Sequence, residues 1–208
     1  MSPLLRLTVL AGVSLAVVTG CTEVPSDIGV HKHRSTATRP RPRAVVHHPS
    51  VAYWNDDPSL KGGTKILINL TKQQAFFFRG KVIVGSTNIS SGRRDYETPP
   101  GKYSVTQKDA HHVSSEYGQY VARSGAVLIH DADINRTRPP RGAHFVGAPM
   151  PYFMRFTGGY GMHAGFVPRF RASHGCIRMP TAMAKHFFDA AEIGTRVEVI
   201  EPPVMVGQ

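Results

Sequence analysis

The sequence predicts a mainly β, β-sandwich-like domain with one or two helices, and three observations favour this class. Short apolar segments follow one another after polar turns. One stretch near the C-terminus has helical periodicity, and the last apolar segment alternates as a strand does. The chain has 208 residues, enough for one domain with a sizeable core.

A β-meander is expected at the start of this domain. Residues 65–70 (KILINL), 75–78 (AFFF) and 82–87 (VIVGST) are predicted strands, joined by the polar turns TKQQ and RGK. The TPPG sequence of residues 98–101 is a predicted turn that shapes the domain and leads into an alternating strand at residues 102–107.

The middle of the chain has weaker signals. Residues 125–130 (GAVLIH) are a predicted strand, whereas the polar, Pro-rich residues 131–149 are predicted to be a long loop. Loops of that length in a compact domain are usually functional or mobile. The apolar cluster that follows is assigned to the core rather than to the lip of a cleft, and it consists of Tyr152, Phe153, Met154 and Phe156.

One helix is clearly indicated near the C-terminus. Pro180 suits its first turn and Gly194 its C-terminal stop. The apolar residues between them recur at helical spacing and should pack on the sheet: Met183, Ala184, Phe187, Phe188 and Ala191. The closing segment TRVEVIE, residues 195–201, alternates cleanly and should complete the sheet.

The first residues have the layout of an export signal. MSPLLRLTVLAGVSLAVVTGC has a cationic start at Arg6, an apolar run over residues 7–18 and small residues before Cys21. Its end, VTGC, resembles the lipobox of bacterial lipoproteins. That resemblance implies a signal peptide at residues 1–20, lipid on Cys21, and an exported, membrane-anchored lipoprotein that faces the periplasm or the cell wall. The alternative is an ordinary signal peptide with a chance cysteine.

A basic linker follows the export signal. The stretch HKHRSTATRPRPRAVVHHPS has five Lys or Arg residues, four His residues and no acid, so residues 21–60 are predicted to be a lipidated, disordered tether. The irregular spacing of its histidines favours a solvated linker over a metal site. The net charge of the whole chain, +11, favours anionic surroundings such as lipid or acidic wall polymers, and we expect no nucleic-acid partner after export. Residues 202–208 are a predicted tail.

The two cysteines of the chain are Cys21 and Cys176. If Cys21 carries lipid, Cys176 has no disulfide partner, and a free thiol in an exported domain favours a reactive role. The structural alternative is a small buried core residue. Cys176 is also expected to lie in the loop just before the helix N-terminus, whose partial positive charge lowers the pKa of a thiol.

Side chains suited to nucleophilic catalysis surround Cys176 in the stretch GMHAGFVPRFRASHGCIRMP. A cysteine nucleophile needs a nearby base, oxyanion donors and a group that binds the substrate. His163 and His174 are candidate bases, and the backbone N–H groups of Gly175 and Cys176 are candidate oxyanion donors. Arg178 is a planar cation suited to a substrate carboxylate.

The motif SHGCIRM at residues 173–179, preceded by MHAG at 162–165 and TPPG at 98–101, resembles the catalytic domain of bacterial L,D-transpeptidases. The opening meander and the closing GTRVEVI also match, so the resemblance covers residues 64–201. It implies the β-sandwich-like fold of that catalytic domain, with no cofactor and no metal.

The resemblance also assigns roles to individual residues. Cys176 matches the nucleophile and His163 the general base, so the two are expected to form a thiolate–imidazolium pair near neutral pH. Ala164 replaces a polar residue found in some members, so a backbone carbonyl would have to orient the base. Residues that match the oxyanion and substrate-binding positions are Ser173, His174, Gly175 and Arg178.

The implied reaction is acyl transfer. Cys176 would attack the third residue of a peptidoglycan tetrapeptide stem, expel the terminal D-alanine and form a thioester. The acceptor is left open: a stem amine gives cross-linking, a lysine of a wall-anchored protein gives anchoring, a D-amino acid gives exchange, and water gives L,D-carboxypeptidase activity. The implied partners are these stems and acceptors, and the membrane through the lipid.

Three alternatives compete with this interpretation. A zinc site would use His163, His174 and Cys176, but the motif offers no further cysteine. A catalytically inactive peptidoglycan-binding lipoprotein is disfavoured by the intact Cys, His and Arg positions. A papain-like peptidase is disfavoured because its Cys precedes its His in the chain. The histidines outside the motif that are interpreted as structural or exposed are His130, His144 and His186.

Overall fold

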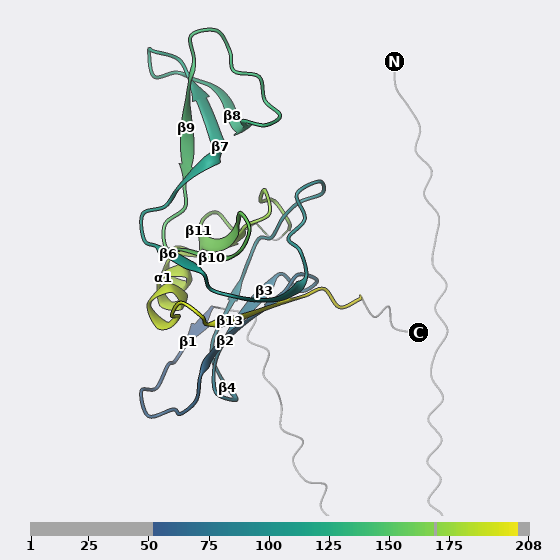
Figure 1. Ribbon diagram of the computed structural model, residues 1–208, viewed down its shortest axis with the longest axis vertical. Helices are drawn as coiled ribbons and strands as arrows, with labels where there is room; N and C mark the ends of the chain where they lie inside the picture. Colours follow the sequence, from purple (N-terminus) through teal and green to yellow (C-terminus); the bar gives the residue numbers. More distant parts are fainter. Residues whose placement is uncertain (1–51, 169, 204–208) are drawn as a thin grey trace, which may run out of the picture. The chain divides into compact units, whose positions relative to one another are not determined.

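The computed structural model describes residues 52–168 and 170–203, which form three β-sheets and one α-helix (Figure 1). The domain is mainly β with a single helix, which confirms the predicted fold class. The predicted signal peptide, the lipidation site Cys21 and the tether up to residue 51 lie outside the described residues, as do residues 204–208. Within the described residues, no helix has the length and apolarity needed to cross a membrane.

The first sheet contains the predicted meander. In chain order its strands are β1 Tyr53–Trp54, β2 Thr64–Asn69, β3 Gln74–Arg79, β4 Val82–Asn88, β5 Gly101–Ser104 and β13 Arg196–Ile200. Their order across the sheet is β1-β4-β3-β2-β13-β5. β2, β3 and β4 pair antiparallel, which confirms the meander, and β13 pairs parallel to β2, which confirms the closing strand.

The short strand β1 lies within the range predicted for the tether. Trp54 of β1 pairs with Gly85 of β4, and a Cβ atom on that glycine would lie only 2.4 Å from the indole ring. The indole also packs near Phe77 and Phe187, with ring centroids 5.3 and 5.7 Å away. β1 therefore belongs to the folded domain.

The second sheet consists of β6 Gln107–Asp109, β10 Phe153–Thr157, β11 Tyr160–Ala164 and β12 Ile177–Met179, in the order β12-β11-β10-β6. The single strand predicted at residues 102–107 is wrong, because the chain divides it between β5 and β6. The change of sheet occurs at Val105 and Thr106. Their N–H groups donate to the carbonyl of Thr195, beside β13, and to the carbonyl of Arg155, in β10.

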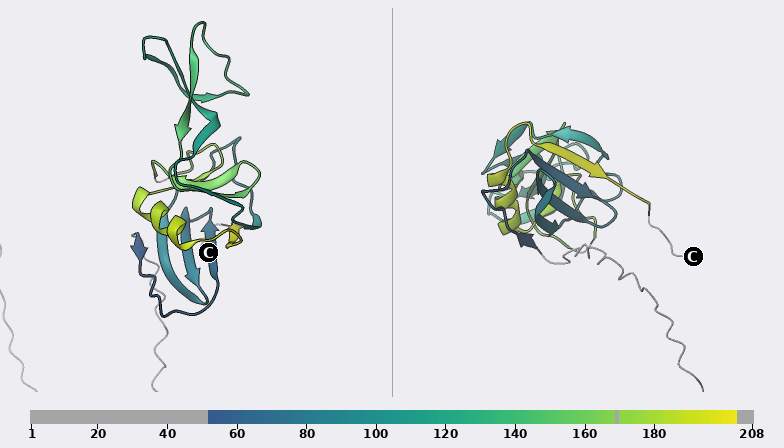
Figure 2. Two further views of the ribbon diagram at one scale, coloured as in Figure 1. Left: turned by 60° about the vertical axis from the view of Figure 1, so that its left-hand side comes forward. Right: turned by 90° about the horizontal axis from the view of Figure 1, so that it is seen from below.

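The third sheet consists of β7 Val113–Val121, β8 Val127–Asp133 and β9 His144–Pro149, in the order β8-β7-β9. Figure 2 shows it extending beyond the other two sheets. The strand predicted at residues 125–130 corresponds to part of β8. The loop predicted at residues 131–149 is wrong at both ends, because β8 continues to Asp133 and β9 begins at His144. Gly147 and Pro149 give β9 the composition of a loop.

The helix α1, Thr181–Ala190, confirms the predicted helix. Pro180 is its N-cap rather than part of its first turn. The helix ends at Ala190, so Gly194 is not its stop; Gly194 has a φ of 93° in the turn that leads to β13. The apolar stripe of α1 packs on β11 and on the first sheet, where the rings of Phe187 and Phe77 have centroids 5.2 Å apart.

The core gathers side chains from the first two sheets and α1. Phe153, Met154 and Phe156 are at most 2% exposed, which confirms their assignment to the core. Tyr152 beside them is half-buried and has a φ of 59°, in the left-handed region.

Candidate active site

Strand pairing places two motif side chains, His163 and Arg178, on one face of the second sheet. β11 and β12 run parallel, with Met162 opposite Ile177 and His163 opposite Arg178. Met162 and Ile177 are fully buried in the core, so His163 and Arg178, next along their strands, point to the other face. Cys176 lies in the bend immediately before β12, two positions before Arg178.

These three side chains line a cleft of about 400 Å³, which we call the Cys176 cleft. The third sheet supplies its other wall, through residues that include Tyr117 of β7, Asp131 of β8 and Val146 of β9. His130 is exposed, as interpreted from the sequence, but it also lines this cleft. Sequence reasoning did not identify this wall, because none of its residues adjoins the motif.

His163 is almost completely buried, with 6% of its surface exposed. Its Nδ1 lies 2.8 Å from the carbonyl oxygen of Ala164, and because a carbonyl only accepts, Nδ1 carries the proton. Nε2 is left with a lone pair, so a backbone carbonyl does orient this ring. Burial lowers the pKa of His163 to about 4; the Ala164 hydrogen bond opposes this effect and the charge of Arg178 adds to it. The imidazole is therefore neutral at neutral pH.

Cys176 is a half-buried, free cysteine. Its Sγ donates to the carbonyl oxygen of Gly159 at 3.7 Å. Burial raises the pKa of the Cys176 thiol, against the opposing effects of the Gly161 N–H group and of the charges on Arg155 and Arg178. The thiol is therefore protonated at neutral pH.

Burial disfavours the charged form of both Cys176 and His163, so it favours a neutral pair in the resting protein rather than the expected thiolate–imidazolium pair. The expected help from a helix N-terminus is wrong, because α1 begins at Thr181 and β12 separates it from the thiol. The electrostatic effect of a helix terminus falls off within its first turn.

Ser173 and Gly175 hold the loop before β12 in shape. Ser173 Oγ donates to the carbonyl of Cys176 at 2.5 Å and accepts the N–H of Gly175 at 3.1 Å. Gly175 has a φ of 110°, and a Cβ atom there would lie 2.6 Å from the ring of Tyr160, so only glycine fits. The Gly175 N–H is thus already bonded. The N–H of Cys176, which has no acceptor in the described part of the chain, is the donor left for an oxyanion.

Thr98 of the TPPG turn braces the same loop. It is 2% exposed, and its Oγ1 donates to the carbonyl of Gly175 at 2.6 Å and accepts the N–H of Gly92 at 3.0 Å. The sequence indicated only a turn here. Its pattern could not show the contact with Gly175, because the two residues are 77 positions apart.

The other two predicted site residues, His174 and Arg178, have different surroundings. His174 contacts residues outside the motif: Nη2 of Arg93 lies 2.8 Å from its Nε2, and Tyr117 stacks on its ring. Sequence reasoning missed Arg93 and Tyr117. Arg178 is half-buried in the Cys176 cleft; burial lowers its pKa and the charge of Asp131 opposes this, but a guanidinium keeps its charge at neutral pH.

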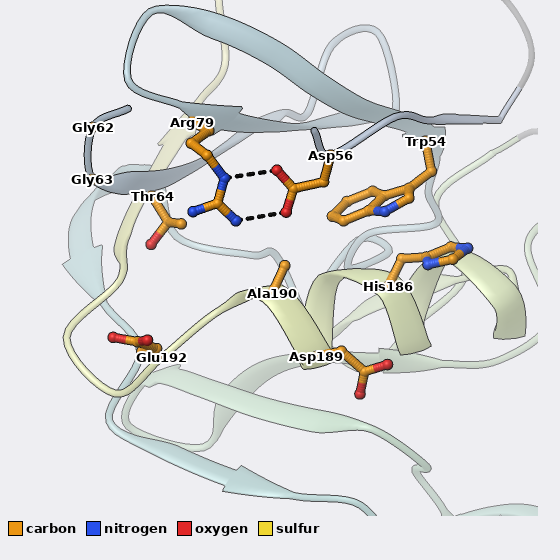
Figure 3. Close-up of a pocket in the computed structure, with 10 residues that line it drawn as sticks. All are labelled: Trp54, Asp56, Gly62, Gly63, Thr64, Arg79, His186, Asp189, Ala190 and Glu192. Carbon is orange, nitrogen blue, oxygen red and sulfur yellow. Dashed lines mark hydrogen bonds and ion pairs between the residues drawn. The ribbon is translucent and has the colours of Figure 1, made fainter. Parts of the chain in front are cut away.

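A cavity of about 670 Å³ lies elsewhere on the domain, and none of the predicted site residues lines it (Figure 3). Asp56 and Arg79 form a doubly hydrogen-bonded ion pair in its wall, at 2.7 and 2.5 Å. His186 stacks on Trp54 with ring centroids 5.0 Å apart. These contacts join the segment around β1 to β3 and α1, which agrees with a structural interpretation of His186. Among residues 52–168 and 170–203, no three His, Cys, Asp or Glu side chains are placed to hold a metal.

A family model, YkuD, described as the L,D-transpeptidase catalytic domain, matches residues 63–199. The chain belongs to this family. The matched range includes the meander, the residues of the Cys176 cleft and most of the closing strand, in agreement with the resemblance found in the motif. A comparison with curated protein sequences gave no match.

The solved L,D-transpeptidases from Mycobacterium smegmatis and Xylanimonas cellulosilytica share this fold. The enzyme from Mycobacterium smegmatis aligns with a TM-score of 0.53 and 16% identity, over 67% of this chain and 59% of its own. The enzyme from Xylanimonas cellulosilytica aligns with a TM-score of 0.50 and 24% identity, over 71% of this chain and 65% of its own. The enzyme from Stackebrandtia nassauensis aligns with a TM-score of 0.48 and 20% identity, over 73% of this chain and 60% of its own. The chain thus spans about three-fifths of the length of the first and the last of these structures.

Proposed function

We propose that this chain is an L,D-transpeptidase that uses Cys176 as the nucleophile on peptidoglycan tetrapeptide stems. The observation that carries the proposal is the Cys176 cleft, in which a free thiol, an oriented neutral imidazole and a guanidinium lie on one wall. Membership of the L,D-transpeptidase family supports the substrate class. A passive binding protein would have no need of a free thiol and an oriented base in one cleft.

The first half-reaction transfers the acyl group to sulfur. Nε2 of His163 takes the thiol proton as Sγ of Cys176 bonds to the carbonyl carbon that links the third stem residue to D-alanine. The carbonyl oxygen becomes an oxyanion, which accepts the N–H of Cys176. When the oxyanion collapses, the C–N bond breaks, the proton on Nε2 passes to the leaving amine, and D-alanine departs.

The second half-reaction transfers the acyl group to an acceptor. An amine attacks the thioester carbonyl and gives a proton to His163; the C–S bond breaks and the sulfur of Cys176 recovers a proton. Nothing is oxidised or reduced, so the chemistry requires no cofactor. We propose a stem amine, a lysine of a wall-anchored protein or a D-amino acid as acceptor, with water as the hydrolytic alternative. Muropeptide analysis of a deletion strain against its parent distinguishes these acceptors by the product that is lost.

Intact-protein mass spectrometry tests the proposed function. After incubation with a disaccharide tetrapeptide, the wild type should gain the mass of the disaccharide–tripeptide acyl group while D-alanine appears in solution. A tripeptide stem, which lacks the leaving D-alanine, is the matched control and should give no adduct. A wild type that forms no adduct and releases no D-alanine would overturn the proposal.

Arg178→Ala is expected to weaken binding of the donor stem more than it slows the chemistry. The guanidinium is charged and half-buried in the Cys176 cleft, where it can pair with a stem carboxylate. Loss of such a pair should raise KM for the donor by about tenfold and change kcat less. Arg196→Ala, on the exposed part of β13, is the control. An unchanged KM in Arg178→Ala would make this arginine structural.

We also propose that the protein is an exported lipoprotein held at a membrane by lipid on Cys21. The VTGC sequence and the basic stretch after it support this proposal. Cys21→Ser is expected to move the protein from the membrane fraction to the soluble fraction, whereas Cys176→Ser should leave it in the membrane fraction. Retention of Cys21→Ser at the membrane would contradict lipidation at this residue.

A further inference from the structure

His174 is enclosed by side chains from separate parts of the chain. Its ring stacks on Tyr117 of β7, with centroids 4.4 Å apart and 16° between the planes, and meets Tyr96 edge-on at 4.6 Å. Only 8% of the His174 side chain is exposed. The residue lines both the Cys176 cleft and a neighbouring cavity of about 410 Å³. The ring is therefore fixed, and its function depends on which nitrogen carries a proton.

The contact with Arg93 decides the tautomer of His174. Nη2 of Arg93 lies 2.8 Å from Nε2 of His174. A guanidinium only donates hydrogen bonds, so Nε2 must accept and cannot carry a proton. Asp131 has an oxygen 3.6 Å from the same Nε2, which is too far for a competing hydrogen bond. The proton of the neutral ring is therefore on Nδ1, which has no hydrogen-bond partner among the described residues.

The charges around His174 also favour the neutral ring. Burial lowers the pKa of His174, and the positive charges of Arg93 and Arg178 act in the same direction. The carboxylates of Asp131 and Asp133 oppose them. A charged ring would be desolvated and repelled by two guanidinium groups, and the Asp131 carboxylate 3.6 Å from Nε2 would offset this only in part, so the neutral Nδ1–H form is the one that fits the contacts.

Arg93 is itself held in place. Its Nη2 also donates to Asp131 at 3.0 Å, its Nη1 donates to the carbonyl of Ala172 at 3.4 Å, and its guanidinium lies 4.9 Å from the centroid of the Tyr96 ring. The backbone N–H of Arg93 donates to the carbonyl of Ser173 at 3.0 Å. Both ends of this residue are thus attached to the loop that carries His174.

We propose that Arg93 is a positioning residue for acyl transfer, which holds His174 as a neutral ring whose Nδ1–H is the hydrogen-bond donor presented to the donor stem. The identity of that ligand rests on the proposed function, whereas the tautomer follows from the Arg93 contact alone. With Nε2 occupied, His174 cannot take the thiol proton there. That task falls to His163, whose Nε2 is unbonded to any described residue.

Histidine tautomers measured by ¹⁵N NMR test the contact directly. Arg93→Met keeps the apolar stem and removes every donor, and Arg94→Met makes the same change at the exposed neighbour. We expect His174 to be the Nδ1–H tautomer in the wild type and in Arg94→Met, and to gain the Nε2–H tautomer in Arg93→Met. An unchanged tautomer in Arg93→Met would overturn the inference. If Arg93→Met folds poorly, Arg93→Gln serves instead, because an amide allows both tautomers.

Kinetics separate positioning from a general structural effect. We expect Arg93→Met to lower kcat/KM for D-alanine release from a tetrapeptide by about tenfold, the loss of one well-placed hydrogen bond. Alkylation of Cys176 by iodoacetamide should be unchanged, because His163 is intact. The positioning role would be refuted if D-alanine release and iodoacetamide alkylation slowed equally, or if D-alanine release were unchanged. If the wild type itself releases no D-alanine, the proposed function fails, and the NMR result still decides whether Arg93 sets the tautomer.

Discussion

Replacement of Cys176 by alanine is expected to abolish formation of the acyl-enzyme. Without the thiol no thioester can form, and the remaining cleft should act at least about 10⁴-fold more slowly. The half-buried side chain loses only its sulfur, so the free energy of unfolding should change by ~1 kcal/mol or less. Intact-protein mass spectrometry with a tetrapeptide stem measures the first effect, and thermal unfolding measures the second.

Two comparisons make the Cys176→Ala result specific. Cys21→Ser removes the other cysteine of the chain and should keep full acylation in solution. A carbapenem, which acylates nucleophiles through its β-lactam ring, gives a second readout independent of the stem. An adduct of either reagent on Cys176→Ala would show that another residue is the nucleophile.

The second large effect is expected for His163→Ala, which should slow acylation at neutral pH by about 10²- to 10⁴-fold. The pKa of the Cys176 thiol is raised by burial, so at neutral pH the sulfur attacks only if a base removes its proton. His163 is neutral there and has a lone pair on Nε2. The acylation rate with a tetrapeptide stem, measured by D-alanine release, checks this prediction.

The pH dependence should change with the same substitution. In the wild type the acylation rate should fall as pH falls through about 4, where His163 gains its proton. In His163→Ala this decrease should be absent, and the rate should instead rise with pH as the thiol ionises above its ordinary pKa. The pKa of His163 is depressed in the folded state, so the wild type also loses stability as pH falls from the ordinary value of 6.5 toward 4. Unfolding must therefore be measured at each pH, so that a lower acylation rate is not confused with loss of folded protein.

Two other histidines provide the controls for His163→Ala. His144→Ala, on the exposed part of β9, should leave acylation and alkylation unchanged. His174→Ala should leave alkylation by iodoacetamide nearly intact but impair acylation by the stem, because His174 is not the base. Loss of alkylation in His174→Ala and its retention in His163→Ala would reverse these assignments.

The elements that the sequence predicted well are those with one clear pattern. The meander has short turns between apolar strands, and α1 has an apolar stripe at helical spacing. The sequence did not indicate β10 and β11, because buried residues occupy consecutive positions in both strands and no alternation marks them. The sequence did not indicate β7 either, because its residues VSSEYGQYV are largely polar and show no apolar strand pattern.

The site was predicted only where its residues are close in sequence. His163, Cys176 and Arg178 of the motif line one cleft, because two adjacent parallel strands carry His163 and Arg178 and Cys176 immediately precedes the second strand. Thr98 and Arg93 reach the same loop from a distant turn, and no local pattern marks such a contact. The charge states were also beyond the sequence, because burial of the thiol and the imidazole is a property of the packed sheets.

The neutral resting state of the thiol has a consequence for chemical durability. Oxidation to sulfenic acid and beyond follows the thiolate form, and an exported protein would meet oxidants without the reducing systems of the cytosol. Cys176 is protonated at rest, and in the proposed mechanism its sulfur becomes nucleophilic only as His163 takes the proton during attack on an electrophile. The burial that keeps the Cys176 thiol protonated thus also protects it from oxidation between turnovers.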